Sequence, residues 1–264
     1  MLYEDQAERF DARAGLPPGV AERIAEALAD AVSLAPGETL LEVGAGTGAL
    51  SLPLVRLPIR YVGFDRSPAM LAVFRRRLEA AGLRAELHVA DGNARWPAPD
   101  GSVSVIFSAR ALHHLAVAHV VAEVRRVARA GGAWLAVGRV RRPKDSTQAV
   151  MRRELRRRLR RHGFEGAHHE AHTEAVFAEL ERAGGRRAPA RTAARWSARH
   201  SPSDALTAWT QKAGLAGLEL PPDVKARILA ELRSWAETRF GDPDEPRAHE
   251  EFFEIEAIFF DPET

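Results

Sequence analysis

Three acidic residues have the type and spacing to line one ligand site. Glu42, Asp65 and Asp91 each stand at, or just beyond, the carboxyl end of a predicted strand. Because the carboxyl ends of parallel strands meet at one edge of a sheet, we expect the three carboxylates to share a crevice. Asp65 is placed to accept hydrogen bonds from ribose hydroxyls. Asp91, one strand further out, is placed to accept one from an adenine amino group.

A glycine-rich turn separates the first of these strands from a helix. The strand 39–43 is followed by glycines at positions 44, 46 and 48. Glycine allows a tight turn and a close approach of a ligand, and a helix N-terminus offers unpaired N–H groups. The turn also fits the dinucleotide fingerprint, and by itself it is equally a connection that binds nothing. The carboxylate of Glu42 would repel a pyrophosphate, which favours a cationic ligand.

Strands alternate with helices five times within residues 36–140, which is typical of a doubly wound, mostly parallel α/β sheet. The apolar runs predict strands at 39–43, 60–65, 84–90, 102–108 and 133–140, and helices at about 3–13, 20–33, 48–56, 68–81 and 117–129. Pro53 comes late in the 48–56 helix and is expected to kink it.

The rhythm changes after residue 141. Amphipathic patterns predict helices at 146–162, 172–183, 203–213 and 222–239, and strands at 191–201 and 251–260. We therefore expect a single domain over residues 1–264. Its parts are a core of 36–140, 188–201 and 250–261, N-terminal helices within 3–33, and a helical cap of 143–186 and 202–246 over the acceptor pocket.

Composition narrows the class of protein. The chain has 264 residues, of which 45% are hydrophobic, with a net charge of +2 and no cysteine. The lack of cysteine excludes disulfides and thiolate metal sites. No apolar run is long enough to span a membrane, and the N-terminus does not resemble a secretory signal, so a cytoplasmic location is expected.

Five segments recur in the order expected of a known family. They are Glu42–Gly48, Val62–Leu71, Ala90–Ala94 with Trp96–Ser102, Ala111–Leu115 and Glu123–Gly132. Together they resemble the class I methyltransferases that use S-adenosylmethionine, and most closely the small-molecule branch typified by ubiquinone- and menaquinone-biosynthesis methyltransferases. The resemblance covers about residues 36–140. It implies a Rossmann-like, seven-stranded sheet with an antiparallel last strand. Ser104 and Ala130 depart from the family pattern, where Asp and Pro are common.

The resemblance implies S-adenosylmethionine as the cofactor. In that family the glycine turn packs against the carboxypropyl and ribose parts, the residue at Asp65 binds the ribose hydroxyls, and the residue at Asp91 reads the adenine edge. The implied cofactor-binding set is Glu42, Gly44, Ala45, Gly46, Gly48, Asp65, Arg66, Met70, Asp91, Gly92, Asn93 and Ser108, with Tyr3 and Arg13 closing over the cofactor from the N-terminal helix.

Methyl transfer from a sulfonium requires alignment of donor and acceptor, and a general base where the acceptor is an acidic hydroxyl or a carbon acid. His113 and His114 follow the fourth predicted strand, where the acceptor pocket of this fold lies. We expect one of them to act as the base or to orient the acceptor; the alternative is a structural histidine. No metal site is predicted, because the run from His168 to His172 is one residue short of the H-E-x-x-H zinc motif.

An arginine-rich helix at 146–162 leaves the class of acceptor open. It is either a solvated face or a lid that attracts an anionic small molecule or RNA phosphates. Aromatic residues do not alternate with the arginines, and the segment Ser108–Ala111 lacks the Asn/Asp-Pro-Pro-Tyr/Phe run of amino-methylating nucleic-acid enzymes. A small-molecule acceptor is therefore favoured. An RNA-directed methyltransferase, an NAD(P)-dependent oxidoreductase and a cofactor-binding module without acceptor chemistry are the alternatives.

Overall fold

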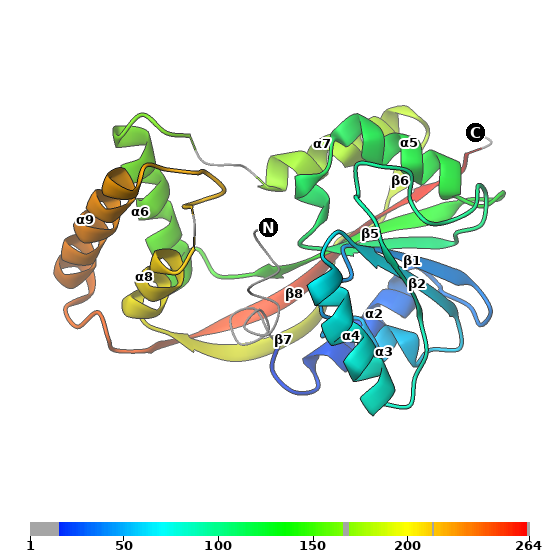
Figure 1. The fold of residues 1–264 in the computed structure, drawn as a ribbon, viewed down its shortest axis with the longest axis horizontal. Coiled ribbons are helices and arrows are strands. Elements are labelled where there is room, and N and C mark those ends of the chain that lie inside the picture. Colours follow the sequence, from blue (N-terminus) through cyan, green and yellow to red (C-terminus); the bar gives the residue numbers. More distant parts are fainter. Residues whose placement is uncertain (1–15, 166–168, 213, 263–264) are drawn as a thin grey trace. The chain divides into compact units, whose positions relative to one another are not determined.

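The computed structural model describes residues 16–165, 169–212 and 214–262 (Figure 1). The predicted helix at 3–13, with Tyr3 and Arg13, lies outside them. The chain divides into two compact units. The first holds the described parts of Met1–Val140, His169–Ala194 and Phe253–Thr264, and the second holds those of Arg141–His168 and Arg195–Phe252.

Five parallel strands form the centre of the first unit, and their order defines the fold. They are β1 (Thr39–Val43), β2 (Arg60–Asp65), β3 (Glu86–Val89), β4 (Val105–Ala109) and β5 (Ala133–Arg141). The sheet order is β3-β2-β1-β4-β5-β8-β6, and β7 pairs with β8. The order of strands reverses between β1 and β4, and open α/β sheets bind their ligands at such a switch point.

The last strands complete a mixed sheet. Strand β8 (Arg247–Phe260) is antiparallel to the two-residue β6 (Arg186–Arg187). Strand β7 (Arg191–His200) is off the main path. The predicted Rossmann-like, mostly parallel sheet with an antiparallel last strand is confirmed. Among the described residues the sheet has eight strands, where the resemblance implied seven, because the short β6 adds one.

Helices cover both faces of this sheet. Figure 1 shows α5 (Val117–Val127) and α7 (His169–Arg182) on one face, and α2 (Val20–Ala31), α3 (Leu52–Val55) and α4 (Pro68–Ala80) on the other. Helix α4 begins as predicted, because the Ser67 hydroxyl accepts a hydrogen bond from Met70 N–H and Pro68 occupies the first helical position.

Two predicted helices differ from the structure. Helix α3 begins only at Leu52, so Pro53 lies in its first turn, where proline is tolerated, and the expected kink is wrong. Helix α7 belongs to the first unit, whereas the expected cap included it. Its apolar residues Val176, Phe177 and Leu180 are buried in the main core, which explains its place.

The second unit has its own apolar core. It contains α6 (Thr147–Arg161), α8 (Pro202–Thr210) and α9 (Pro222–Phe240), with parts of β7 and β8. Its buried side chains include Met151, Leu155, Leu159, Leu206, Trp209, Ile228 and Leu232. Its role as a cap stays a prediction. Within the described part of the chain, every helix is too short or too polar to cross a membrane.

Candidate cofactor site

Strand register brings the predicted carboxylates to one edge of the sheet. Glu42 pairs with Gly63 of β2 and with Phe107 of β4, next to the carboxyl end of β1. Asp65 ends β2 and pairs with Val89, the last residue of β3, so that Asp91 follows two residues later. The edge therefore carries acidic groups on three adjacent strands, as the sequence predicts.

The glycine turn after β1 needs glycine for two different reasons. Gly44, Gly46 and Gly48 have φ values of 78°, 55° and 75°, a region that other residues rarely adopt. A Cβ on Gly44 would lie 2.2 Å from the Ala111 Cβ, and one on Gly48 would lie 2.0 Å from the Phe74 ring. Apart from Gly46 itself and its two chain neighbours, no described atom lies within 4 Å of a Cβ built on Gly46. The turn is thus closely packed at both ends and open in the middle.

Asp65 connects this turn to β2. Its Oδ2 accepts a hydrogen bond from Gly46 N–H at 3.0 Å, and its Oδ1 accepts one from Ser67 N–H at 2.9 Å. The side chain is partly exposed. Each carboxylate oxygen can accept a further hydrogen bond, so the group can still bind two ligand hydroxyls.

Glu42 differs from the other two carboxylates because it is buried, with 2% of its surface exposed. The Tyr61 hydroxyl donates a hydrogen bond to its Oε2 at 2.5 Å. Burial raises the pKa of Glu42 to about 7, with a smaller contribution in the same direction from the charge of Asp65; the Tyr61 hydrogen bond opposes the shift. Tyr61 was not among the predicted site residues, although a hydroxyl in an otherwise apolar buried strand was the signal for it.

The loop after β3 is held by its own polar groups. Asp91 is exposed, and its Oδ1 accepts a hydrogen bond from Asn93 N–H at 3.0 Å. The Asn93 Oδ1 accepts one from Ala116 N–H at 2.8 Å, which ties the loop to the start of α5. A Cβ on Gly92 would lie 2.6 Å from Leu115. Asp91 is therefore held at the edge of the sheet with its carboxylate open to solvent.

The remaining predicted cofactor residues differ in exposure. Ser108 is fully buried, and its hydroxyl donates a hydrogen bond to the Val43 carbonyl at 3.0 Å, which joins β4 to β1. Ala45 and Met70 are also buried, whereas Arg66 is exposed. The Ser108 hydroxyl therefore serves to join two strands, whereas the exposed Arg66 side chain can reach a ligand.

Three histidines gather after β4. His113 and His114 lie in the short 3-10 helix η2 (Leu112–His114), with ring centroids 4.0 Å apart. Burial, then the charges of Arg66 and His172, lower the pKa of His114. His172 comes from α7, and its ring donates a hydrogen bond to the Leu112 carbonyl. The Nε2 of His172 is buried with no hydrogen-bond partner among the described residues, so Nδ1 is the donor to Leu112.

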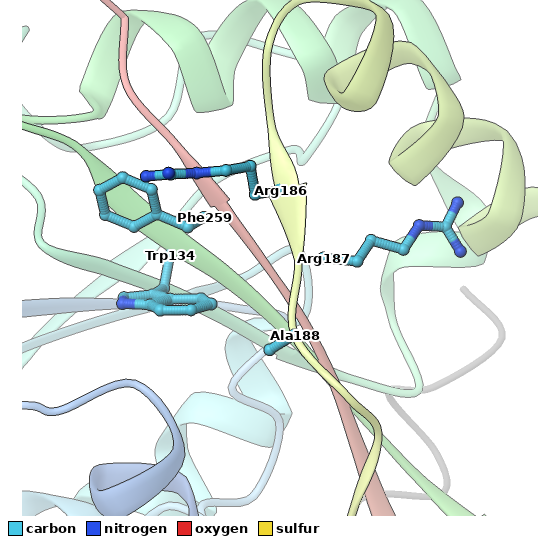
Figure 2. A pocket seen from close by; sticks show the side chains of 5 residues that line it. All are labelled: Trp134, Arg186, Arg187, Ala188 and Phe259. Atoms are coloured by element: carbon cyan, nitrogen blue, oxygen red, sulfur yellow. The ribbon is translucent and has the colours of Figure 1, made fainter.

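A separate pocket of about 340 Å³ lies where β5 begins, at the edge of the sheet opposite to Asp65. Figure 2 shows Arg186 lying against the Phe259 ring, while Arg187 points away. Arg187 is bound by Glu174 at 2.7 Å. Because β5 is parallel to β4 and begins at Ala133, Trp134 lies far from the glycine turn. The pocket is therefore not the candidate cofactor site.

The arginines of α6 are partly neutralised. Glu154 is buried and accepts a hydrogen bond from Arg158 Nε at 2.8 Å. Arg158 also donates to Glu231 at 2.9 Å. The cationic face of α6 therefore consists of the other arginines, among which Arg153, Arg156 and Arg160 are exposed.

Residues 40–132 match the model of a methyltransferase domain. The chain is 37% identical over 87 residues to a protein-L-isoaspartate O-methyltransferase of Methylorubrum extorquens. This alignment covers 31% of this chain and 38% of that protein. It is 34% identical over 160 residues to a demethylmenaquinone methyltransferase of a Parafrankia species, covering 54% and 62%. It is 33% identical over 154 residues to a malonyl-[acyl-carrier protein] O-methyltransferase of Serratia marcescens, covering 56% of each. The chain thus spans less than two thirds of the length of these relatives.

Solved structures of low identity share the fold. The cyclase SpnF has a TM-score of 0.57 at 18% identity, covering 98% of this chain and 93% of that one. A methyltransferase-like protein from Bacillus halodurans has a TM-score of 0.57 at 16% identity, covering 90% and 98%. The fold is that of the Rossmann-like methyltransferases. The predicted resemblance to the class I S-adenosylmethionine-dependent methyltransferases is confirmed, and S-adenosylmethionine is the cofactor that goes with this class.

Proposed function

We propose that this protein transfers the methyl group of S-adenosylmethionine to a small-molecule acceptor. The observation that carries the proposal is the link between Asp65 and the glycine turn. The Gly46 N–H bond to Asp65 holds a carboxylate beside a glycine whose missing Cβ would meet open space among the described residues. This arrangement suits a nucleoside whose ribose hydroxyls donate to Asp65.

The residues at the edge of the sheet fit the cofactor. Asp65 binds the ribose, Asp91 accepts a hydrogen bond from the adenine amino group, and the backbone around Gly46 supports the carboxypropyl part. Glu42, when ionised, attracts the positive charge of the sulfonium. When bound, the cofactor supplies a methyl group that is already activated, so the protein has to align the acceptor and exclude water.

The acceptor side of the reaction needs a group that holds or removes a proton. His172 is suited to this, because its Nδ1–H is used by the Leu112 carbonyl and its Nε2 keeps a lone pair. We place it with His113 and His114 as the group that orients or deprotonates the acceptor. Sequence alone pointed to His113 and His114, and considered His172 only as part of a metal motif. Its place on α7, against η2, comes from the fold.

Two observations support a small acceptor. Among the relatives given above, the longest alignment is to a demethylmenaquinone methyltransferase, an enzyme named for a small molecule. In addition, no aromatic residue alternates with the arginines of α6 in the sequence, so the helix does not offer a row of rings that would stack on bases. The arginines therefore suit an anionic small acceptor better than RNA.

Isothermal titration calorimetry with S-adenosylmethionine and S-adenosylhomocysteine tests the donor. We expect both to bind, and D65N to weaken binding at least tenfold, which is about 1.4 kcal/mol. D145N is the matched control, because Asp145 is an exposed aspartate of the second unit and does not belong to the edge of the sheet that carries Asp65. Absence of heat at millimolar ligand, or equal affinities for both variants, would contradict the donor site.

A labelled methyl donor then tests the transfer. Incubation with cell extract and radiolabelled S-adenosylmethionine is expected to yield a labelled product that passes a 3-kDa filter. Labelled RNA would favour the RNA-directed alternative. Cofactor binding without any labelled product would favour a module that has lost acceptor chemistry.

A further inference from the structure

Two histidines and a glutamate meet in the second unit, away from the residues discussed so far. His200 is the last residue of β7, and His249 and Glu251 lie near the start of β8, which pairs with β7. Alternate residues of a strand point to the same face, so His249 and Glu251 are side by side. His200 joins them from the neighbouring strand.

The distances between these groups suit a bound ion. His249 Nε2 lies 3.1 Å from Glu251 Oε1, and His200 Nε2 lies 3.4 Å from the same oxygen. One ligand atom from each residue lies within 4.8 Å of the other two. Ligands at about 2.1 Å from a tetrahedral zinc ion are about 3.4 Å apart, so only small side-chain movements would be needed.

The cluster is largely shielded from water. The exposed fractions of the side chains are 7% for His249, 6% for Glu251 and 27% for His200. The Nδ1 of His249 is buried without a hydrogen-bond partner among the residues that the structure describes. Nε2 is the ring nitrogen that faces Glu251, so a cation in the cluster would bind Nε2, and the unpartnered Nδ1 is not itself one of its ligand atoms.

We propose that His200, His249 and Glu251 bind a divalent zinc-type cation that holds β7 to β8. Two imidazoles and one carboxylate are a common zinc ligand set, and they leave a fourth position for water. The proposal is independent of the methyl-transfer function. Sequence alone predicted no metal site, because His200 is far from His249 in the chain and only strand pairing brings them together.

Arg142 determines how tightly the ion is held. Its Nε–H donates to Glu251 Oε1 at 2.5 Å, so its charge compensates the carboxylate when no cation is bound. A divalent cation has to compete with this guanidinium, because like charges at such distances repel. Removal of Arg142 is therefore expected to strengthen metal binding, which a purely structural ion pair would not do.

The test uses the full-length chain after treatment with a chelator, titrated with Zn²⁺ by calorimetry and with Co²⁺ by visible absorption. We expect one Zn²⁺ per chain, a tetrahedral Co²⁺ spectrum, and affinity at least tenfold weaker in H249Q and in H200Q. We expect R142Q to bind at least threefold more tightly. H162Q is the matched control. His162 also contacts a carboxylate, that of Glu231, which it shares with Arg158, but no second histidine among the described residues joins this pair in a cluster.

Three outcomes of these titrations would contradict the metal site. The proposal would be overturned if H200Q and H249Q bound Zn²⁺ as tightly as the wild type. It would also be overturned if H162Q lost as much Zn²⁺ affinity as those two variants. A loss of affinity in R142Q would overturn it as well. Because H249Q alters a buried position, circular dichroism checks that it folds; if it does not, the more exposed H200Q and R142Q still give opposite expected shifts.

Discussion

The Tyr61 hydroxyl on β2 donates a hydrogen bond of 2.5 Å to the Glu42 carboxylate on β1. Both side chains are buried, and Tyr61 also contacts the Phe74 ring edge to face, with centroids 6.1 Å apart. Burial raises the pKa of both groups, that of Glu42 to about 7. The first strand of the candidate cofactor site thus carries, next to its carboxyl end, an acid that changes charge near neutral pH.

Cofactor binding should be linked to this ionisation. A cationic ligand favours the charged carboxylate, so binding at pH 7 is expected to release about half a proton from Glu42. The heat of binding should then depend on the ionisation enthalpy of the buffer, and affinity should fall between pH 7.5 and 6. Calorimetry in phosphate and in Tris buffers compares the two heats of binding, and titrations between pH 7.5 and 6 give the affinity. E42Q should show the same heat in both buffers; a buffer dependence that persists in E42Q would assign the proton to another group.

Stability should also depend on Glu42. Its folded pKa, about 7, is above the ordinary value of 4.5, so the carboxyl ionises first in the unfolded chain. The contribution of Glu42 to the free energy of unfolding is therefore complete below about pH 4.5. It is lost as the pH rises through the folded pKa, and the loss is about 3 kcal/mol at most. Urea unfolding should show that the free energy of unfolding falls more between pH 5 and pH 8 in the wild type than in E42Q. Equal losses would mean that Glu42 is not protonated in the folded state.

The two reasons for glycine in the turn can be separated by mutation. G48A has to place a methyl group against Phe74 at a positive φ. G82A also has a positive φ, of 65°, but apart from its chain neighbours no described atom lies within 4 Å of the added methyl group. We expect G82A to lose about 1 kcal/mol of unfolding free energy and G48A at least 2 kcal/mol more, from backbone strain plus overpacking. Chemical denaturation of both variants gives the comparison. Equal losses would show that Phe74 moves aside without cost.

The histidines after β4 can be examined without knowledge of the acceptor. Burial is the main reason that the pKa of His172 is lowered, and burial followed by the charges of Arg66 and His172 lowers that of His114. We expect ¹⁵N chemical shifts to show both rings neutral at pH 7, with His172 in the Nδ1–H form. H172Q identifies the signals, and the partly exposed His88 ring, which contacts the Glu86 carboxylate, provides the comparison. A protonated His172 at pH 7, or an Nε2–H form, would remove it as the base.

Much of the first unit could be predicted because its patterns are local. The strand ends at Glu42 and Asp65, the cap at Ser67 and the glycines of the turn depend on neighbours a few residues away. The start of α3 and the place of α7 could not be predicted, because both depend on which distant residues cover their apolar side chains. The same is true of Ser108, whose hydroxyl is used by the Val43 carbonyl from another strand.

The amino-acid sequence by itself determined the alternation of strands and helices, the glycine turn and the acidic residues at the strand ends, because hydrophobic period and backbone preference act over short distances. Only the tertiary structure decided that Glu42 is shielded by Tyr61, that His172 faces Leu112, and that His200 joins His249 and Glu251. Those relationships arise from strand pairing and core packing between segments that are far apart in the chain.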